Sequence, residues 1–284
     1  MASPFKRIKF DIQPGKVALI TGGSSGIGLS IAKLLASLGM DIWLVSRRKE
    51  LLEKASEEIY LSCKDSNQYC NVISADVSDW DQVLDVATRI EEVAGVPDLL
   101  INSAGVTHPG HFQDLDIDIF RWMMDVNYFG TVNMSRAILA GMISRGSGYI
   151  VNISSMAGLL GVYGYTAYGA SKYAVRGYSD VLRAELKPMD IGLSIVFPSD
   201  TDTPQLAYEE EFKPKETKYI NSIANIKPPE KVAQAIAKGI STGNYHIFSS
   251  FDDKLLYKLS NIFGAGVYPI MDYLVSRAQR STPQ

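Results

Sequence analysis

Tyr168 and Lys172 are the pair of side chains in this sequence with the clearest capacity for acid–base chemistry. They are four positions apart in a stretch, residues 166–187, whose apolar spacing predicts a helix, so they lie above one another on one helix face. An unperturbed tyrosine, with a pKa of about 10, exchanges protons poorly near neutrality, and a neighbouring ammonium favours its phenolate form. Helices carry such pairs by chance, so this pair alone is weak evidence for an active site.

Ser155 strengthens the case because it comes thirteen residues before Tyr168, at the end of a strand-like run over 149–154. The carboxyl end of a strand and the next helix can converge on one carbonyl, which Ser155 would hydrogen-bond while Tyr168 protonates it. Ser154 is the competing candidate, and because side chains alternate along a strand, the two serines point in opposite directions. Asn127, inside a predicted helix over 118–145, is a further polar candidate.

A glycine-rich turn joins the first predicted strand, residues 16–21, to a predicted helix over 26–38. Glycines let backbone N–H groups approach a pyrophosphate, and a helix N-terminus favours an anion. A glycine-rich turn is a weak signal by itself, but a position between strand and helix is the context that supports a dinucleotide site. We expect cofactor contacts from Thr21, Gly22, Ser24, Ser25, Gly26, Ile27 and Gly28.

Arg47 and Arg48 follow the second predicted strand, residues 41–45, where an NAD site usually carries a carboxylate for the ribose hydroxyls. Guanidinium groups instead match the geometry and charge of a 2′-phosphate. The arginines therefore predict NADP(H) as the cofactor, with Arg47 as first choice. The alternative is that they are solvated cations of the first helical turn. Even then, the carboxylate that an NAD site usually carries would be missing.

Short apolar runs alternate with amphipathic stretches along most of the chain. This alternation indicates a parallel sheet, and nearly continuous apolar strands indicate that helices cover both of its faces. We therefore expect an α/β fold, a single doubly wound Rossmann-type domain over residues 1–250, with its ligand outside the carboxyl ends of the strands. The predicted strands are 16–21, 41–45, 69–75, 98–102, 149–154, 193–197 and 246–249, and the further helices are 50–60, 79–93, 118–145 and 166–187.

The C-terminal residues 251–284 contain two apolar stripes at helical spacing, which predicts a helical hairpin joined at residues 264–266. Three interpretations stay open: a dimer interface, a cover over the core, or an element that lies on a membrane and presents a lipid to the site. The stripes are Leu255, Leu259, Ile262 and Phe263, then Val267, Ile270, Met271, Leu274 and Val275, followed by Arg277 and Arg280.

Composition argues against several classes of function. A net charge of −3 leaves no basic excess for a nucleic acid. Cys63 and Cys70 fit no common zinc spacing and are too few for a disulfide scaffold, and the three histidines lack neighbours at ligand spacing, so we expect no metal site. No run of about 18 apolar residues occurs, and the first residues do not read as a secretory leader. These features predict a cytoplasmic protein.

Taken together, the T-G-x-x-x-G-x-G turn, Ser155 and the Y-x-x-x-K pair resemble the short-chain dehydrogenase/reductase family over residues 16–247. The resemblance implies that Lys172 holds the nicotinamide ribose and that Asn127 holds a water linking Lys172 to solvent. Residues 204–226 would form the loop that covers the substrate as a mobile lid. The remaining implied cofactor contacts are Asp76 and Val77 at the adenine, Asn102, Ala104 and Gly105 in an N-S-A-G motif, and Pro198, Thr201 and Thr203, with Thr203 at the carboxamide.

Two positions depart from the family pattern: Ser103 replaces the second Asn of N-N-A-G, and Ser199 replaces the Gly of P-G-x-x-x-T. Within the family, residues 158–166, 175–177 and 200–204 resemble the 3-ketodihydrosphingosine reductases. That resemblance implies NADPH-dependent reduction of a long-chain sphingoid ketone by a homo-dimer or tetramer, at the cytosolic face of the endoplasmic reticulum if the source is eukaryotic. The alternatives are a reductase of another hydrophobic carbonyl, such as a steroid, retinoid or 3-oxoacyl group, and a non-catalytic nucleotide-binding scaffold.

Overall fold

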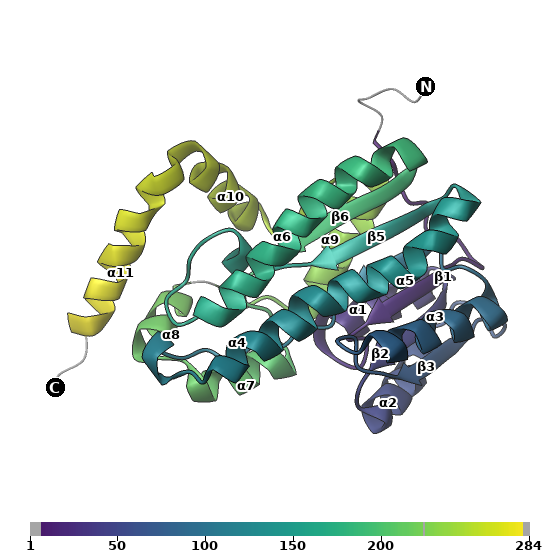
Figure 1. The fold of residues 1–284 in the computed structure, drawn as a ribbon, viewed down its shortest axis with the longest axis horizontal. Coiled ribbons are helices and arrows are strands. Elements are labelled where there is room, and N and C mark those ends of the chain that lie inside the picture. The colour runs from purple at the N-terminus through teal and green to yellow at the C-terminus, as the bar shows by residue number, and fades with distance from the viewer. Residues whose placement is uncertain (1–6, 224, 281–284) are drawn as a thin grey trace.

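The computed structural model describes residues 7–280 except residue 224, and among these residues a single seven-stranded sheet forms the centre of the fold (Figure 1). Every pair of neighbouring strands is parallel, which confirms the predicted doubly wound sheet. The strand order is β3-β2-β1-β4-β5-β6-β7. The strands are β1 (Val17–Thr21), β2 (Asp41–Ser46), β3 (Cys70–Ser74), β4 (Leu99–Asn102), β5 (Gly148–Ile153), β6 (Ile191–Phe197) and β7 (His246–Phe248).

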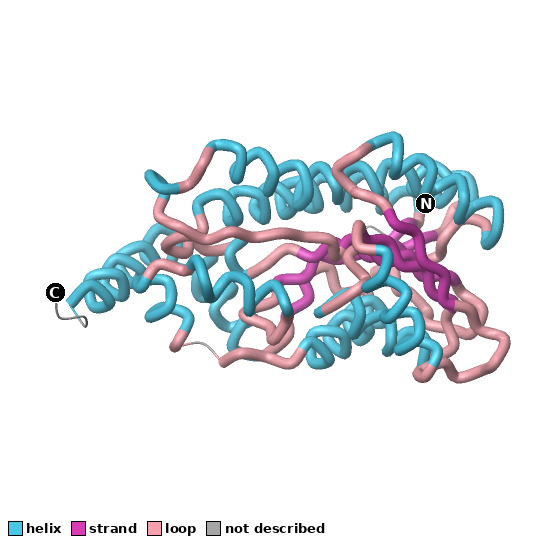
Figure 2. Tube along the Cα trace, turned by 90° about the horizontal axis from the view of Figure 1, so that it is seen from below, coloured by secondary structure: helices cyan, strands magenta, loops and turns pink. Residues whose placement is uncertain are grey.

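Because side chains alternate along the strands, they contribute to two separate hydrophobic clusters, one on each face of the sheet. In β1, Ala18 and Ile20 are buried on one face, and Val17 and Leu19 on the other. Figure 2 shows a layer of helices on either side of the strands, which confirms that both faces are covered. The first face carries α1 (Gly26–Ser37), α2 (Lys49–Tyr60) and α9 (Pro229–Thr242); the second carries α3 (Trp80–Ala94), α5 (Gly130–Arg145) and α6 (Thr166–Leu186).

The helix predicted over 118–145 is interrupted. It consists of α4 (Ile117–Met123), a π-helical segment (Met124–Phe129) and α5. Asn127 lies in the π-helical segment, and its backbone carbonyl accepts a hydrogen bond from Thr131 Oγ1 at 2.8 Å. Its side chain bonds a loop after β4 instead of pointing to solvent. The apolar spacing of the sequence carries no sign of this local widening, which often marks functional sites.

Residues 204–226, expected as a loop, contain two helices: α7 (Pro204–Phe212) and α8 (Lys215–Asn221). Thr203 caps α7 by accepting a hydrogen bond from Leu206 N at 3.3 Å, and Pro204 occupies the first helical turn, where its missing N–H costs nothing. The expectation of an irregular loop was therefore wrong, and the role of this segment as a lid stays a prediction. Helix α9 was also absent from the predicted elements.

The C-terminal region forms the two predicted helices, α10 (Phe251–Phe263) and α11 (Tyr268–Arg280). They diverge from the bend between them as an open V, and α11 packs against α8 (Figure 1). Helix α10 is fastened at its start, where buried Lys227 Nζ pairs with Asp253 and donates to Ser250 Oγ at 2.8 Å. Within the described residues, no helix combines the length and apolar character that crossing a bilayer requires.

Candidate active site

A cavity of about 1130 Å³ lies at the carboxyl ends of the strands, where the strand order turns back between β1 and β4. Doubly wound sheets bind their ligands at this position. Residues that follow β1 to β6 line the cavity, and α7, α8, α10 and α11 extend its wall away from the sheet. One space therefore joins the glycine-rich turn to the C-terminal helices.

The glycine-rich turn has the shape that a dinucleotide requires. Gly22 has φ of +65°, and a Cβ there would lie 2.8 Å from Ala104 N, while a Cβ at Gly28 would lie 2.4 Å from Gly22 O. Ser25, the N-cap of α1, makes no side-chain capping bond in the described structure, and the first turn of α1 holds no acidic residue. The first backbone N–H groups of α1 therefore face an anion site without a competing carboxylate.

Most of the residues predicted to bind a cofactor line this one cavity. They come from loops far apart in the sequence, which the parallel sheet brings to one edge. The residues that line it are Gly22, Ser24, Ser25, Gly26, Ile27, Gly28, Arg47, Arg48, Asp76, Val77, Ala104, Gly105, Tyr168, Lys172, Pro198, Thr201 and Thr203.

Thr21 and Asn102 are the exceptions, because both side chains are buried behind the cavity wall. Thr21 Oγ1 accepts hydrogen bonds from Ser103 N and Ala104 N, both at 3.1 Å. Asn102 Nδ2 donates to Ser135 Oγ and Asn152 Oδ1, both at 2.9 Å. Thr21 thus fixes the backbone of the N-S-A-G loop, and Asn102 joins the end of β4 to α5 and β5. Their contact with a cofactor stays a prediction.

Arg47 lies at the rim of the cavity, where its Nη1 is 3.7 Å from Asp76 Oδ2. The arginine side chain is 53% exposed, and an ion pair with that exposure contributes little. Arg47 can therefore leave Asp76 and bind another anion at a small cost in free energy. Arg48 is exposed beside it at the N-cap position of α2.

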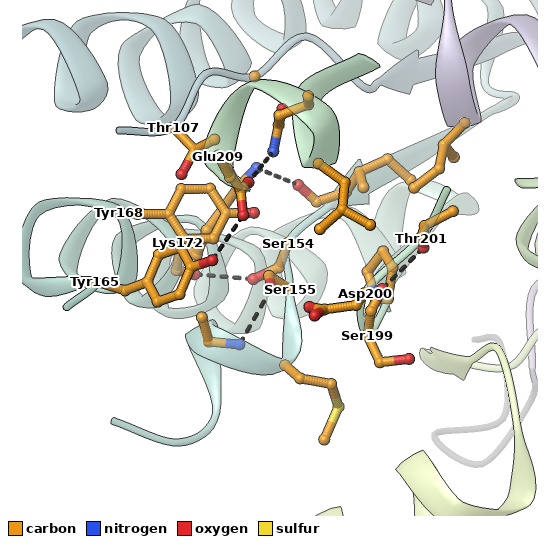
Figure 3. A pocket seen from close by; sticks show the side chains of 18 of the residues that line it. Thr107, Ser154, Ser155, Tyr165, Tyr168, Lys172, Ser199, Asp200, Thr201 and Glu209 are labelled. Atoms are coloured by element: carbon orange, nitrogen blue, oxygen red, sulfur yellow. Dashed lines mark hydrogen bonds between the residues drawn. The ribbon is translucent and has the colours of Figure 1, made fainter. Parts of the chain in front are cut away.

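Ser155, Tyr168 and Lys172 converge on the same cavity from β5 and α6, and Figure 3 shows them together. The Ser155 hydroxyl accepts a hydrogen bond from Ala157 N at 3.1 Å, and as a donor near Tyr168 it lowers the pKa of that tyrosine. Ser154, the competing candidate, donates its hydroxyl hydrogen to the backbone carbonyl of Lys172 at 3.0 Å. The alternation of side chains along β5 therefore separates a structural serine from the serine that meets the tyrosine.

Lys172 is almost fully buried, and its Nζ donates to Ile153 O at 3.0 Å. Burial lowers the pKa of its ammonium to about 8. The Nζ atom lies 5.7 Å from the centre of the Tyr168 ring. The group held beside the phenol is therefore a cation that can lose its proton within the ordinary pH range.

Asn127 supports this arrangement from behind the wall. Its Oδ1 accepts from Val106 N at 2.8 Å, and its Nδ2 donates to Val106 O and to Ser171 Oγ. A Cβ built on Gly105 would lie 3.3 Å from Asn127 Oδ1 and 3.4 Å from Lys172 Nζ, so both side chains border this glycine. Asn127 thus joins the loop after β4 to α6 beside Lys172.

The pKa of Tyr168 differs from the sequence-based expectation. Burial raises it well above the ordinary value, and the Glu209 carboxylate raises it further, while the hydrogen bonds from Ser155 and Gln205 work in the opposite direction. In the protein without ligands, burial and Glu209, rather than Lys172, therefore determine the pKa of Tyr168. The consequence is a phenol that keeps its proton at neutral pH, which is the form a proton donor needs.

Sequence reasoning did not assign a role to the side chains of α7 that face Tyr168. Glu209 is buried; Tyr165 Oη donates to its Oε2 at 2.6 Å and Gln205 Nε2 donates to its Oε1 at 3.2 Å. Gln205 also lowers the pKa of Tyr168. The four-residue spacing of Gln205, Glu209 and Lys213 would have indicated one helix face, had these residues been recognised as helical.

Comparison with known proteins agrees with this geometry. A family model described as short chain dehydrogenase matches residues 16–214. The chain is 40% identical to a 3-ketodihydrosphingosine reductase of Bos taurus over 92% of this chain and 79% of that protein, and 40% identical to a 3-dehydrosphinganine reductase of Danio rerio over 81% and 70%. A short-chain dehydrogenase of Burkholderia phymatum, solved in complex with NAD, shares the fold with a TM-score of 0.79 and 24% identity over 89% of this chain and 95% of that one.

These findings confirm the resemblance that the turn at residues 21–28 and the Tyr168–Lys172 pair indicated. The family match covers more than half of the chain, including the whole sheet from β1 to β6. The chain belongs to the short-chain dehydrogenase family and is an oxidoreductase.

Proposed function

We propose that this protein is an NADPH-dependent reductase that converts 3-ketodihydrosphingosine to dihydrosphingosine in sphingolipid synthesis. The observation that carries the proposal is the convergence of Ser155, Tyr168 and Lys172 on a cavity that continues into an apolar region. The names of the relatives at 40% identity support the substrate. The intact proton-donating constellation disfavours a binding-only scaffold, because binding a nucleotide requires no acid.

NADPH, when bound, supplies the hydride for such a reduction. We assign its pyrophosphate to the turn at residues 22–28 and its 2′-phosphate to Arg47 and Arg48. We assign Asp76 and Val77, which line the cavity after β3, to the adenine, and Thr203, which lines it before α7, to the carboxamide. Lys172 is assigned to the nicotinamide ribose, since among the described residues its Nζ donates one hydrogen bond, to Ile153 O, and an ammonium can form up to three.

Tyr168 supplies the proton in this proposal. As the carbonyl oxygen gains negative charge, the Ser155 hydroxyl stabilises it and Tyr168 transfers its proton to it. The ammonium of Lys172 then stabilises the phenolate that remains. Asn127 holds the loop and helix that position Lys172, and we assign to it the water that returns a proton from solvent.

The far end of the cavity suits a long aliphatic chain. Its lining is mostly apolar and comes from α8, α10, α11 and the segment before α6. Each CH₂ group buried there is worth about 0.8 kcal/mol, so a long alkyl chain gains much of its affinity from this region. The apolar lining includes Leu160, Ile220, Ile223, Leu256, Ile270, Met271 and Leu274.

The first prediction concerns substrate and acid together. With NADPH, the protein should reduce 3-ketodihydrosphingosine faster than a steroid, a retinoid or a 3-oxoacyl thioester. Tyr168→Phe should lower kcat at least about 100-fold, because it removes the proton donor. NADPH oxidation measured by absorbance tests both. Tyr60→Phe, an exposed tyrosine at the end of α2 and outside the cavity, is the matched control and should be fully active.

Two outcomes would contradict this part of the proposal. Faster turnover of the unrelated ketones would refute the sphingoid substrate. Undiminished NADPH oxidation by Tyr168→Phe would refute the assigned acid.

The second prediction concerns cofactor choice. Replacing both Arg47 and Arg48 by Ala should lower kcat/KM for NADPH by roughly 10- to 100-fold, because charge-assisted hydrogen bonds to the 2′-phosphate are lost. The value for NADH, which lacks that phosphate, should change little. Lys49→Ala, an exposed neighbour outside the cavity, is the control. A wild-type protein that prefers NADH would show the assignment to be wrong.

We also propose that α10 and α11 contact a membrane surface. Their apolar side chains stay exposed, and the same two helices line the apolar end of the cavity, so a lipid ketone could enter directly from a bilayer. The first apolar stripe, Leu255, Leu259, Ile262 and Phe263, is exposed, which disfavours a role as a cover over the core. The most exposed apolar members are Phe251, Ile262, Phe263, Tyr268, Ile270 and Tyr273.

The third prediction tests this surface. Ile262→Glu combined with Phe263→Glu should reduce co-sedimentation with phosphatidylcholine vesicles by more than about tenfold, because charges oppose insertion of the helix face. Leu61→Glu, an equally exposed leucine at the end of α2, should have no effect. An intact chain that never binds vesicles would refute the membrane contact. Dissociation of an oligomer by the double substitution would instead identify the face as a subunit interface.

A further inference from the structure

A buried carboxylate lies beside the proposed proton donor. Glu209 projects from α7 into the cavity wall and is 6% exposed, and Gln205 from the same helix donates a hydrogen bond to Glu209 and lowers the pKa of Tyr168. Figure 3 shows Glu209 next to the rings of Tyr165 and Tyr168. This carboxylate therefore lies beside the residue that protonates the substrate in our proposal.

The surrounding charges leave this part of the wall short of cations. Asp200 lines the same cavity, and burial raises the pKa of both Asp200 and Glu209. Lys213 Nζ lies 4.0 Å from Glu209 Oε2, but its close ion pair is with Glu210. Lys227 is paired with Asp253. Besides Lys172, which lies beside the Tyr168 ring, the ammonium near Glu209 is that of Lys213, and Lys213 is shared with Glu210. A further cation at Glu209 would therefore be stabilised.

Thr107 provides a second and independent observation. Its side chain is 2% exposed and lines the cavity, yet its hydroxyl has no hydrogen-bond partner in the described part of the chain. Figure 3 draws this hydroxyl on the side of the Tyr165 and Tyr168 rings. A buried hydroxyl without a partner costs free energy, and a ligand group in the cavity would remove that cost.

We propose that Glu209 and Thr107 bind the ammonium group of the substrate, so that the protein selects ketones with a protonated amine on the carbon next to the carbonyl. The inference rests on the proposed function, whose substrate is such an amino ketone. When the carbonyl oxygen lies at Ser155 and Tyr168, the ammonium on the neighbouring carbon is only a few bonds away, and Glu209 lies beside the Tyr168 ring (Figure 3). Glu209 accepts one N–H bond from it and the Thr107 hydroxyl accepts another.

This contact also assists the reaction. The negative charge of Glu209 raises the pKa of Tyr168 and so makes proton donation harder. An ammonium bound at Glu209 offsets that charge at the moment when the substrate is in place. Binding of the correct substrate therefore makes Tyr168 a better acid, whereas a neutral ketone leaves the carboxylate uncompensated.

The test compares two substrates, 3-ketodihydrosphingosine and its deaminated analogue, 1-hydroxyoctadecan-3-one. Glu209→Gln keeps the size of the side chain and removes its charge. The ratio of kcat/KM between the amine and the deaminated ketone should fall by roughly 10- to 100-fold in this variant. Thr107→Val should lower the same ratio severalfold, and because the hydroxyl makes no internal bond, no such bond is lost. Glu211→Gln, on the exposed side of α7, should leave the ratio unchanged.

The outcomes separate this inference from the function on which it rests. An unchanged ratio in Glu209→Gln would overturn the inference. An equal loss for both ketones would also overturn it, because Glu209 would then act only on Tyr168 through Gln205. A wild-type protein that reduces other ketones but not the amino ketone would refute the proposed function itself. Thermal unfolding of each variant shows whether it is folded.

Discussion

The buried ammonium of Lys172 is the interaction on which the rest of the site depends. Its hydrogen bond to Ile153 O joins α6 to the carboxyl end of β5, the same point at which the chain leads into Ser155. A side chain on Gly105 would contact Lys172 Nζ, and Asn127 holds the adjoining loop against α6. A cation is costly to bury, so the elements around it must be fixed in place before it can be held there.

The site balances this cation against carboxylates on its other side. Lys172 faces the ring of Tyr168 from within α6, while Glu209 approaches from α7, across the cavity. The carboxylate and burial keep the phenol protonated, and in our proposal the ammonium of Lys172 stabilises the phenolate after transfer. A donor for reduction needs both conditions: it must carry the proton when the carbonyl arrives and must release it when the oxygen becomes negative.

The sequence predicted the features that depend on local pattern. Apolar runs such as 17–20 identified strands covered on both faces. Alternation indicated that Ser154 and Ser155 point in opposite directions, and the family's serine-to-tyrosine spacing selected Ser155. It did not reveal features that depend on distant contacts. The π-helical segment at Asn127 reflects bonds to Val106 and Ser171, and the roles of Thr21 and Asn102 behind the wall reflect their neighbours in the sheet. Glu209 was missed because its helix was expected to be a loop.

The most direct test of the account is the pH dependence of kcat/KM for a ketone without an amine, since an amine would titrate in the same range. Burial lowers the pKa of Lys172 to about 8, and Tyr168 stays protonated above that pH, so kcat/KM should fall about tenfold per pH unit above about pH 8. Lys172→Arg, which stays charged, should lose that alkaline decline in whatever activity remains. A wild-type kcat/KM that stays level to about pH 9.5 would contradict the role given to Lys172.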